Sequence, residues 1–405
     1  MALSRRSVTL VLCALLHGFT HVYPMVLVPL YLQLQREFSL AGVAQATLLV
    51  SVQGIAYCVA SFPAGILADR VSRKLLLSAG LAVNALAFLG LARTQSYGAA
   101  MAYLLLAGLA GSFYHPAAGA LVVKLFADRP GQALGIGGIG SACGFFFGPL
   151  YGGWRGQMAG WRAPCWELGW AGLVAAAMFA LLAQDAPVEL GNRKEPRPWL
   201  PSLRFVVLFG LLALVFSLRD LGALGVHSLT SLFLQRAHGY REAVVGLYLG
   251  LTSLTGVVAN PMFGVLSDNP YRLRWAAGLL GTAGFAAAAI PWMPARGVLP
   301  ALMTYGFCLF ATYPVLEAAL AESVPDELRG RLFGLFIAVG GIIGNLSPWL
   351  AGLITDFLGP RAITPLAYVP SFALLGATIA TASSGLFLLR WARRVNAGEI
   401  NLMRS

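Results

Sequence analysis

The chain has 405 residues, of which 58% are hydrophobic and only 11% are charged. Soluble domains carry about 25% charged residues, so a soluble protein of this size could not bury so much apolar surface. The net charge of +12 would fit a nucleic-acid-binding protein, but the basic residues gather between apolar segments, which argues against that class.

Twelve apolar segments of about 20 residues are each long enough to cross about 30 Å of hydrocarbon. In chain order they are 7–32, 43–67, 75–92, 97–124, 132–153, 164–183, 204–234, 244–266, 275–293, 298–320, 331–355 and 366–390. The first lacks a small-residue cleavage site, so we expect a retained helix and no secretory signal. Pro24, Pro116 and Pro314 fit kinks within spans.

The only long polar break near the middle is rich in proline and mixed charge, which is typical of a linker. We therefore predict a six-helix bundle over 1–186, a cytoplasmic linker over 187–203, and a second bundle with a tail over 204–405. Because each half crosses the membrane an even number of times, the halves have the same orientation, related by an axis along the membrane normal. Nineteen of the 28 Lys and Arg residues fall on the side of the termini, so both termini are expected to be cytoplasmic.

The two halves also repeat the same residues at an offset of 199. The stretch Gly65-Ile66-Leu67-Ala68-Asp69 returns as Gly264-Val265-Leu266-Ser267-Asp268, Tyr114 returns as Tyr313, and Pro149 returns as Pro348. The offset holds across nearly ninety residues. Such a repeat in a membrane protein indicates a two-fold transporter.

The turn after the second span reads Gly65-Ile66-Leu67-Ala68-Asp69-Arg70-Val71-Ser72-Arg73-Lys74. It resembles the G-x-L-a-D-R-x-G-R-K/R signature of the major facilitator superfamily, with Ser72 in place of the second glycine. The resemblance covers the whole chain and implies twelve helices in two pseudo-symmetric halves around a central cavity. It also implies a gate, in which Asp69 lies on the N-terminus of another helix. We assign the gate to the residues of both copies: Gly65, Asp69, Arg70, Arg73, Gly264 and Asp268.

The fifth span contains a glycine-proline motif, Gly144-Phe145-Phe146-Phe147-Gly148-Pro149-Leu150-Tyr151-Gly152-Gly153. It resembles the G-x₃-G-P-x-x-G-G motif of the superfamily's exporters. Glycines allow close helix packing and proline introduces a bend. Gly144, Gly148, Pro149, Gly152 and Gly153 are therefore predicted to form a hinge, although ordinary glycine-proline packing is the alternative.

Two further patches are similar to the fosmidomycin-resistance type of exporter. One is His17-Gly18-Phe19-Thr20-His21 and the other is Gly111-Ser112-Phe113-Tyr114-His115-Pro116-Ala117. In that group the positions of His21 and Ala117 hold acids. The N-terminal half therefore lacks the carboxylates expected for proton coupling.

Seven ionisable residues lie inside the predicted spans, and the resemblance places all of them on the four helices that line the cavity. They are His17, His21, His115, Arg219, Asp220, His227 and Glu317. Ionisable groups at this depth cost about 2.5–3.5 kcal/mol each on insertion scales, so they usually face water or one another.

His17 and His21 are four residues apart and share one helix face. Three interpretations stay open for them: a proton- or anion-binding pair, a transition-metal site with His115, or polar packing. We assign substrate binding to His17, His21, Tyr114, His115, His227 and Tyr313, and expect no metal.

Arg219, Asp220 and Glu317 form the predicted coupling group. A buried arginine needs a carboxylate partner, and the rotation of about 100° between neighbouring residues favours Glu317 over Asp220. The alternative is a static ion pair.

The predicted function is secondary active transport of a small amphipathic molecule across the bacterial inner membrane, as proton-coupled efflux by alternating access. An importer of an organic anion and a non-transporting receptor or scaffold are the alternatives. No nucleophile–base set or phosphate loop is present, so an enzyme is not expected. We expect a monomer in the lipid bilayer, with a small-molecule substrate and protons as partners, no nucleic acid, and no cofactor.

Overall fold

The computed structural model describes residues 4–186, 203–266, 271–321 and 338–388. Every regular element in these ranges is a helix. The long helices are α1 (Arg5–Val26), α3 (Val43–Ala68), α4 (Arg73–Arg93), α5 (Tyr97–Gly111), α6 (Tyr114–Leu125), α7 (Pro130–Ala159), α8 (Arg162–Leu182), α9 (Leu203–Arg236), α10 (Glu242–Leu266), α11 (Arg272–Ala289), α12 (Ala295–Ala321), α14 (Ser347–Leu358) and α15 (Val369–Thr381). The short helices are α2 (Tyr31–Glu37), η1 (Val28–Leu30), η2 (Ile290–Trp292), η3 (Gly359–Ile363) and η4 (Pro365–Tyr368).

Within the described residues, twelve helical segments are long and apolar enough to span a membrane, and each overlaps one predicted span. The fifth runs over Pro130–Ala159, further than predicted at both ends. The first extends through α2 to Glu37. The all-helical membrane fold predicted from the hydrophobic segments is therefore confirmed.

Proline breaks one of these spans and leaves another continuous. Helix α5 ends at Gly111 and α6 begins at Tyr114, so the fourth span is interrupted at Ser112 and Phe113. The ring of Pro116 would clash with the carbonyl of Ser112, four residues earlier, in a continuous helix. Pro24, by contrast, lies inside α1 without ending it.

Serine side chains begin three of the helices. Ser4, Ser72 and Ser96 accept hydrogen bonds from backbone N–H groups in the first turns of α1, α4 and α5. Each satisfies a donor that has no partner within its own helix.

The described residues form two compact units. Unit 1 contains those within 1–191, 227–254 and 345–365, and unit 2 contains those within 192–226, 255–344 and 366–405. The boundary between the units therefore falls inside α9 and α10. The predicted division at 187–203 stays a prediction, because 187–202 lie outside the described residues.

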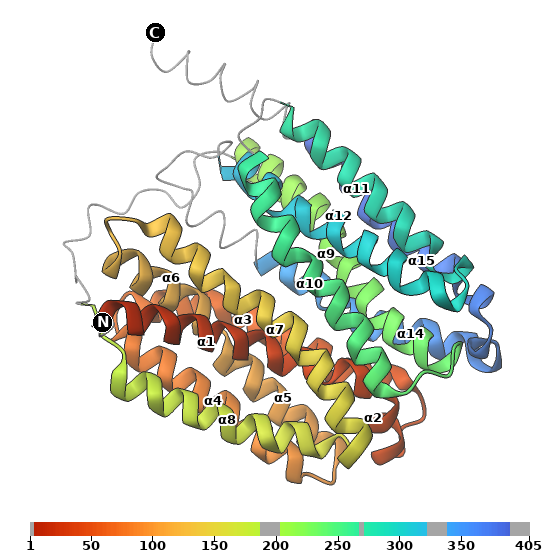
Figure 1. Cartoon of the computed structure of the whole chain (residues 1–405), viewed down its shortest axis with the longest axis horizontal. Coiled ribbons are helices and arrows are strands. Elements are labelled where there is room, and N and C mark those ends of the chain that lie inside the picture. Colours follow the sequence, from red (N-terminus) through yellow and green to blue (C-terminus); the bar gives the residue numbers. More distant parts are fainter. Residues whose placement is uncertain (1–3, 187–202, 267–270, 322–337, 389–405) are drawn as a thin grey trace. The chain divides into compact units, whose positions relative to one another are not determined.

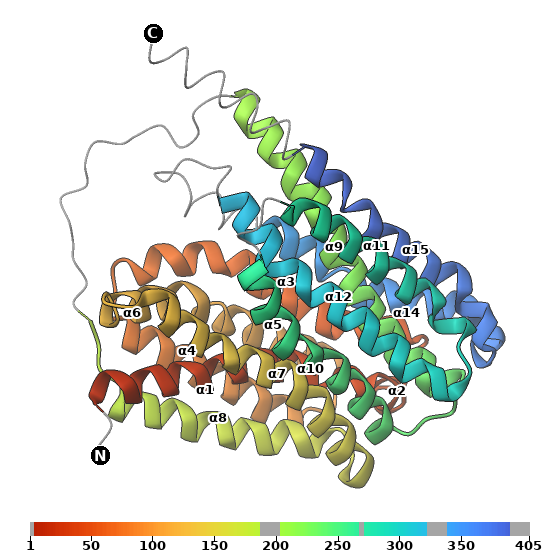
Figure 2. The same cartoon turned by 45° about the horizontal axis from the view of Figure 1, so that its top comes forward.

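In unit 1, α1 packs against α7, α4 against α8, and α3 against α5 and α14. The red helix α1 runs beside the yellow helix α7 in both cartoon views (Figures 1 and 2). In unit 2, α11 packs against α12 and α15, and Leu212, Phe216 and Phe263 belong to its buried core.

A stripe of glycines lets α7 approach α1. A Cβ at Gly140, Gly144 or Gly152 would overlap the backbone of α1, at Ala14, Gly18 and Val26 respectively. Backbones this close leave no room for larger side chains. The two helices are thus held in register at the level of the first span's histidines.

The other face of the predicted hinge motif contacts α10. A Cβ at Gly153 would overlap the Glu242 carbonyl, and one at Gly246 would overlap the Pro149 carbonyl. The motif therefore packs α7 against two helices of unit 1 at once. Its hinge role stays a prediction.

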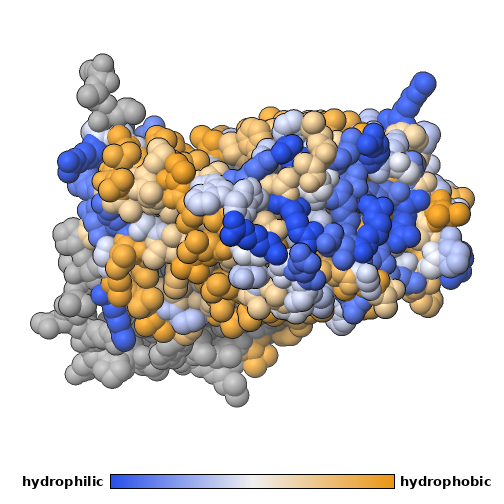
Figure 3. All heavy atoms as spheres, turned by 90° about the horizontal axis from the view of Figure 1, so that it is seen from below, coloured by the Kyte–Doolittle hydropathy of each residue, from blue (hydrophilic) through white to orange (hydrophobic). Residues whose placement is uncertain are grey.

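Large apolar side chains also lie on the surface of the described residues. Leu181, Phe285 and Phe357 are 80%, 77% and 81% exposed. On the face drawn in Figure 3, hydrophobic areas lie beside a broad hydrophilic area. Apolar surface of this extent is expected where helices contact lipid, because acyl chains solvate it as well as a protein interior does.

Candidate functional site

Three histidines come together in unit 1. His17 and His21 lie one turn apart on α1, and His115 lies in the first turn of α6. The His17 ring centroid is 5.1 Å from that of His21 and 5.0 Å from that of His115. Each ring offers a nitrogen, and these nitrogens all lie within 4.8 Å of one another. The break in the fourth span places His115 at the start of a helix, facing the pair on α1.

Neighbouring groups fix the orientation of these rings. His17 Nδ1 lies 2.9 Å from the Gly137 carbonyl oxygen on α7. Tyr114 stacks on His17 at 4.7 Å and donates its hydroxyl to the Cys13 carbonyl at 2.8 Å. Phe145 stacks on His21 at 4.3 Å. Residues of α1, α6 and α7 therefore hold the cluster together. The sequence predicted the shared helix face of His17 and His21 and a possible site with His115, but not the contacts with α7.

The cluster retains free polar atoms. His17 Nε2 and the Tyr57 hydroxyl are buried without a hydrogen-bond partner among the described residues. Tyr57 lies edge-on to His115 at 6.1 Å, and His115 itself is exposed. The group thus combines an accessible imidazole with buried nitrogen and oxygen atoms that can bind a further group.

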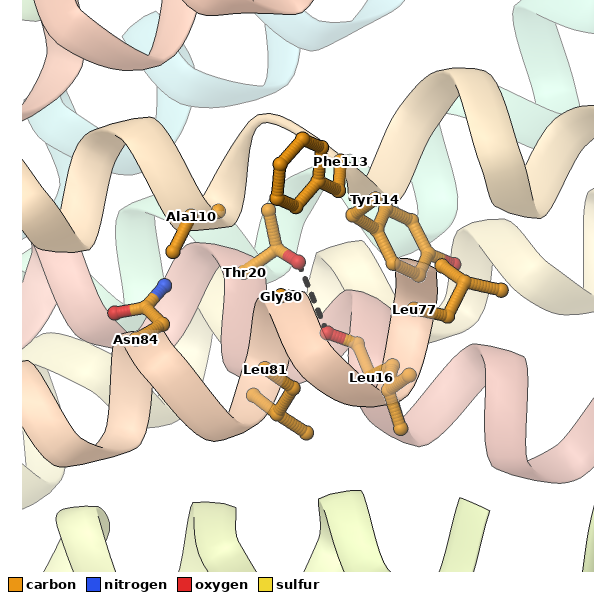
Figure 4. A pocket seen from close by; sticks show the side chains of 10 residues that line it. Leu16, Thr20, Leu77, Gly80, Leu81, Asn84, Ala110, Phe113 and Tyr114 are labelled. Atoms are coloured by element: carbon orange, nitrogen blue, oxygen red, sulfur yellow. Dashed lines mark hydrogen bonds between the residues drawn. The ribbon is translucent and has the colours of Figure 1, made fainter. Parts of the chain in front are cut away.

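Tyr114 separates the cluster from a small hollow between α1, α4 and α5 (Figure 4). The hollow is lined mainly by apolar side chains, with Thr20 donating to the Leu16 carbonyl at 3.0 Å. Asn84 also lines it, and its side-chain oxygen is buried without a partner among the described residues. This hollow is a packing gap behind the cluster and carries little chemistry.

Unit 2 holds an ion pair on α9 in which the arginine is buried and the aspartate is partly exposed. Arg219 is 4% exposed, and its guanidinium Nε and Nη2 lie 3.0 and 2.9 Å from Asp220 Oδ1. The Tyr313 ring of α12 lies under the guanidinium at 3.9 Å, and the Tyr313 hydroxyl donates to Asp220 Oδ1 at 3.3 Å. Charge, cation–π contact and hydrogen bond together stabilise an arginine that would be costly to bury alone.

The structure shows the pairing with Asp220, and the favoured pairing of Arg219 with Glu317 stays a prediction. The long arginine side chain folds back to its own neighbour, so the rotation between adjacent residues does not prevent contact. Glu317 lies in α12, but its side chain is outside the described part of the chain. Gly340 and Gly344 lie close to Asp220. A Cβ at either position would be only 3.3–3.4 Å from atoms of Asp220, so the two glycines leave room for this aspartate.

The offset of 199 relates the two polar groups. Asp220 is the counterpart of His21, and Tyr313 is the counterpart of Tyr114. In each unit, a titratable residue on one helix and a tyrosine on another belong to the same polar cluster. His227 lies on α9, and its buried Nε2 has no hydrogen-bond partner among the described residues; no ring contact joins it to the three histidines.

The structure describes most of the residues assigned to the gate, but it does not test their role. Asp69 ends α3 and, like Arg70, is exposed, and its carboxylate makes no hydrogen bond to the described residues. Arg73 begins α4, and its Nε and Nη1 are buried without partners among those residues. Gly264 lies in α10, whereas Asp268 is outside the described residues. The gate role of these residues stays a prediction.

An aspartate does lie on a helix N-terminus, but at the opposite end of α3. Asp356 of α14 accepts hydrogen bonds from the N–H groups of Val43 and Ala44 at 2.8 and 2.9 Å. The N-cap residue of α3 is Gly42, which has no side chain to cap with. A Cβ at Gly42 would overlap the Asp356 carboxylate. Asp356 therefore supplies the cap.

The counterpart at offset 199 repeats this contact. Gln157 of α7 is equivalent to Asp356 and accepts a hydrogen bond from the Ala243 N–H of α10 at 3.2 Å. Ala243 is the counterpart of Ala44. Neither Asp356 nor Gln157 was among the predicted site residues. The signal was present, since Asp356 directly follows a predicted span and its counterpart is polar.

A second ion pair involves the exporter-like motif. Arg155 Nε lies 3.1 and 3.0 Å from the two Glu167 oxygens, and Tyr151 also donates to this carboxylate. Both partners are partly exposed. The pair joins α7 to α8 near the ends of these helices.

Comparison with known proteins gives the family. The sequence model of the Major Facilitator Superfamily matches residues 10–348 and 228–402. The chain is 26% identical over 305 residues to the MFS-type transporter SLC18B1 of Homo sapiens, covering 71% of this chain and 64% of that protein. It is 24% identical over 313 residues to the multidrug resistance protein MdtG of Serratia proteamaculans, covering 74% of each.

The efflux pump PmrA of Streptococcus pneumoniae is 24% identical over 316 residues, covering 75% of this chain and 78% of that one. Among solved structures, a bacterial homolog of the human lysosomal transporter Spinster, in an inward-facing and unoccupied conformation, has a TM-score of 0.77 at 17% identity. The comparison covers 97% of this chain and 98% of that one, and it shows a shared fold. The chain belongs to the Major Facilitator Superfamily, and it is a multi-pass membrane transporter of small molecules and not an enzyme.

Proposed function

We propose that this transporter exports a small amphipathic compound in exchange for protons. The observation that carries the proposal is the ion pair between the buried Arg219 and the partly exposed Asp220, with Tyr313 against it. Ionisable residues within membrane spans are expensive and mark ion or substrate pathways. The multidrug names of MdtG and PmrA support export, as does the exporter-like glycine-proline motif.

Coupling follows from the chemistry of the pair. While Asp220 is ionised, it neutralises Arg219 and accepts from Tyr313. A proton on Asp220 removes that negative charge, and Arg219 then interacts more strongly with a second acceptor, either Glu317 or an anionic part of the substrate. A carboxylate that exchanges its partner for a proton links proton entry to a change of state.

Gating is assigned to the two ends of α3. Asp69 and Arg70 are proposed to form a contact in one state of the cycle, and Asp356 stabilises the other end of the helix in the state described here. A helix terminus and a carboxylate attract each other by about 0.3–1 kcal/mol at exposed sites. Contacts of this strength can shift the equilibrium between two conformational states of the transport cycle without making either state irreversible.

The protein is proposed to work as a monomer in a bacterial inner membrane, with both termini in the cytoplasm. The basic residues support this orientation, since most of them lie on that side of the predicted spans.

The test is transport in right-side-out and inverted vesicles with an imposed pH gradient. A panel of cationic, zwitterionic and anionic amphipathic dyes serves as substrates. Export predicts that at least one dye accumulates in inverted vesicles only when their interior is acidic. The Asp220→Asn protein, matched for expression, is the control and should not respond to the gradient.

The other outcomes separate the alternatives. Gradient-driven accumulation of an anionic dye in right-side-out vesicles would instead establish an importer. Absence of transport of any compound in either orientation, from correctly inserted protein, would favour a receptor or scaffold.

A further inference from the structure

We infer that His17, His21 and His115 form a binding site for a divalent late transition-metal ion of the Zn²⁺, Co²⁺, Ni²⁺ and Cu²⁺ class. This inference goes beyond the proposed transport function and does not depend on it. It also departs from the expectation of no metal that the sequence alone gave. The reason is the grouping of three imidazoles that only the fold brings together.

The first argument is geometric. One nitrogen from each ring lies within 4.8 Å of the others, and two of the rings are on one helix face, one turn apart. Zn–N bonds are about 2.0–2.1 Å long, so an ion bound between the rings would draw them closer. His115 lies in the first turn of α6, directly after the break at Ser112 and Phe113. Because its side chain is exposed, its rotation toward an ion costs little free energy.

The second argument concerns the nitrogen that would bind. Since the Gly137 carbonyl is an acceptor, His17 Nδ1 must donate its hydrogen to it at 2.9 Å. In the neutral ring this leaves the lone pair on Nε2, and this atom is buried without a partner among the described residues. Metal-bound histidines nearly always donate their other N–H to a carbonyl or carboxylate in this way.

The third argument identifies the ion. The ligand set is made of imidazoles alone, which suit zinc, copper, nickel and iron, whereas magnesium and calcium prefer oxygen ligands. Three histidines leave a fourth coordination position open for water or an anionic group. The exposure of His115 gives an ion access to the site.

Aromatic neighbours support the ring positions without supplying ligands. Tyr114 and Phe145 stack on His17 and His21 at 4.7 and 4.3 Å, which limits rotation of these two imidazoles. A cluster preorganised on two sides binds an ion with less loss of conformational freedom.

The test uses Co²⁺ as a spectroscopic probe on purified full-length protein carrying a histidine-free affinity tag. Tetrahedral cobalt bound to imidazoles absorbs strongly in the visible range, whereas hydrated octahedral cobalt absorbs only weakly there. We expect one equivalent of Co²⁺ to bind with visible absorption and to be displaced by Zn²⁺. His21→Gln and His115→Gln should each weaken binding at least about 10-fold, the lower bound seen when even a ligand-orienting group is removed.

His238→Gln is the matched control. His238 packs on Phe233 and Tyr240 and not on the three histidines, so this variant should bind cobalt as the wild type does. Size-exclusion profiles verify that each variant is folded. No visible absorption in the wild type, or equal binding in His21→Gln and His115→Gln, would overturn the proposal. Because no gradient or substrate is used, that result would leave the transport proposal standing.

Discussion

Asp356 Oδ1 accepts a hydrogen bond from the backbone N–H of Val43 at 2.8 Å, across 313 residues of chain. This contact joins α14 to the N-terminus of α3. The sequence motif had placed the same chemistry, a carboxylate on a helix N-terminus, at Asp69. In the structure, Asp69 lies at the C-terminal end of α3 and is exposed. Asp356 contacts the N-terminal end of the same helix.

Replacing Asp356 with Asn should lower the stability of unit 1. The amide loses the charge that interacts with the α3 dipole, and one of its two acceptor atoms. A lost cap typically costs about 1 kcal/mol, which should appear as a lower midpoint in thermal unfolding of the purified protein. Asp69→Asn serves as the control and should leave the midpoint unchanged. Equal midpoints for Asp356→Asn and the wild type would show that the cap contributes nothing.

Asp69→Asn should instead reduce transport while expression and insertion stay normal. The reason is that its charge is proposed to contact a helix terminus only in another state of the cycle. Initial rates in vesicles measure this, with Western blots to match protein amounts. Wild-type rates from a well-expressed Asp69→Asn protein would remove Asp69 from the gate.

Asp220→Asn should destabilise the protein and abolish pH-driven transport. It removes the carboxylate that accepts from Arg219, and breaking a buried ion pair from one side costs about 3–5 kcal/mol. Tyr313→Phe is the matched variant, because it keeps the ring under Arg219 and removes the hydroxyl that donates to Asp220, a hydrogen bond of about 1 kcal/mol. Chemical denaturation should therefore rank wild type, Tyr313→Phe and Asp220→Asn in decreasing stability. A different order would exclude the pair as the main stabilising contact.

Glu317→Gln separates coupling from stability. The amide cannot carry a proton, so gradient-driven transport should stop while substrate binding persists. Dye binding and vesicle transport, measured on the same preparation, distinguish the two. Persistent gradient-driven transport would remove Glu317 from the coupling group and leave Asp220 as the proposed proton carrier.

Gly140→Ala should disrupt the packing of α7 on α1. Its Cβ would overlap the Ala14 carbonyl, and overpacking costs about 1–3 kcal/mol. Gly138→Ala on the same helix is the control, because no atom lies within 4 Å of the new Cβ. There, the better helix propensity of alanine should leave stability equal or slightly higher. Thermal unfolding of both variants tests the pair, and similar midpoints would contradict the role given to the glycine stripe.

The sequence determined the membrane class, the twelve spans and the family, because these follow from local properties. An apolar segment of sufficient length must form a helix in lipid, whatever packs beside it. The offset of 199 also identified Tyr114 and Tyr313 as equivalent before any contact was known.

Tertiary structure decided which of these residues meet. His17 and His21 share a face by helical spacing. Only the packing of α6 on α1 brings a nitrogen of His115 within 4.8 Å of a nitrogen of each of these two rings. Likewise, spacing alone disfavoured Arg219 with Asp220, because it does not account for the length and flexibility of the arginine side chain. The sequence shows that Asp356 and its counterpart Gln157 are both polar, but it does not identify their partners. These are backbone N–H groups, which every helix offers and no side-chain pattern marks.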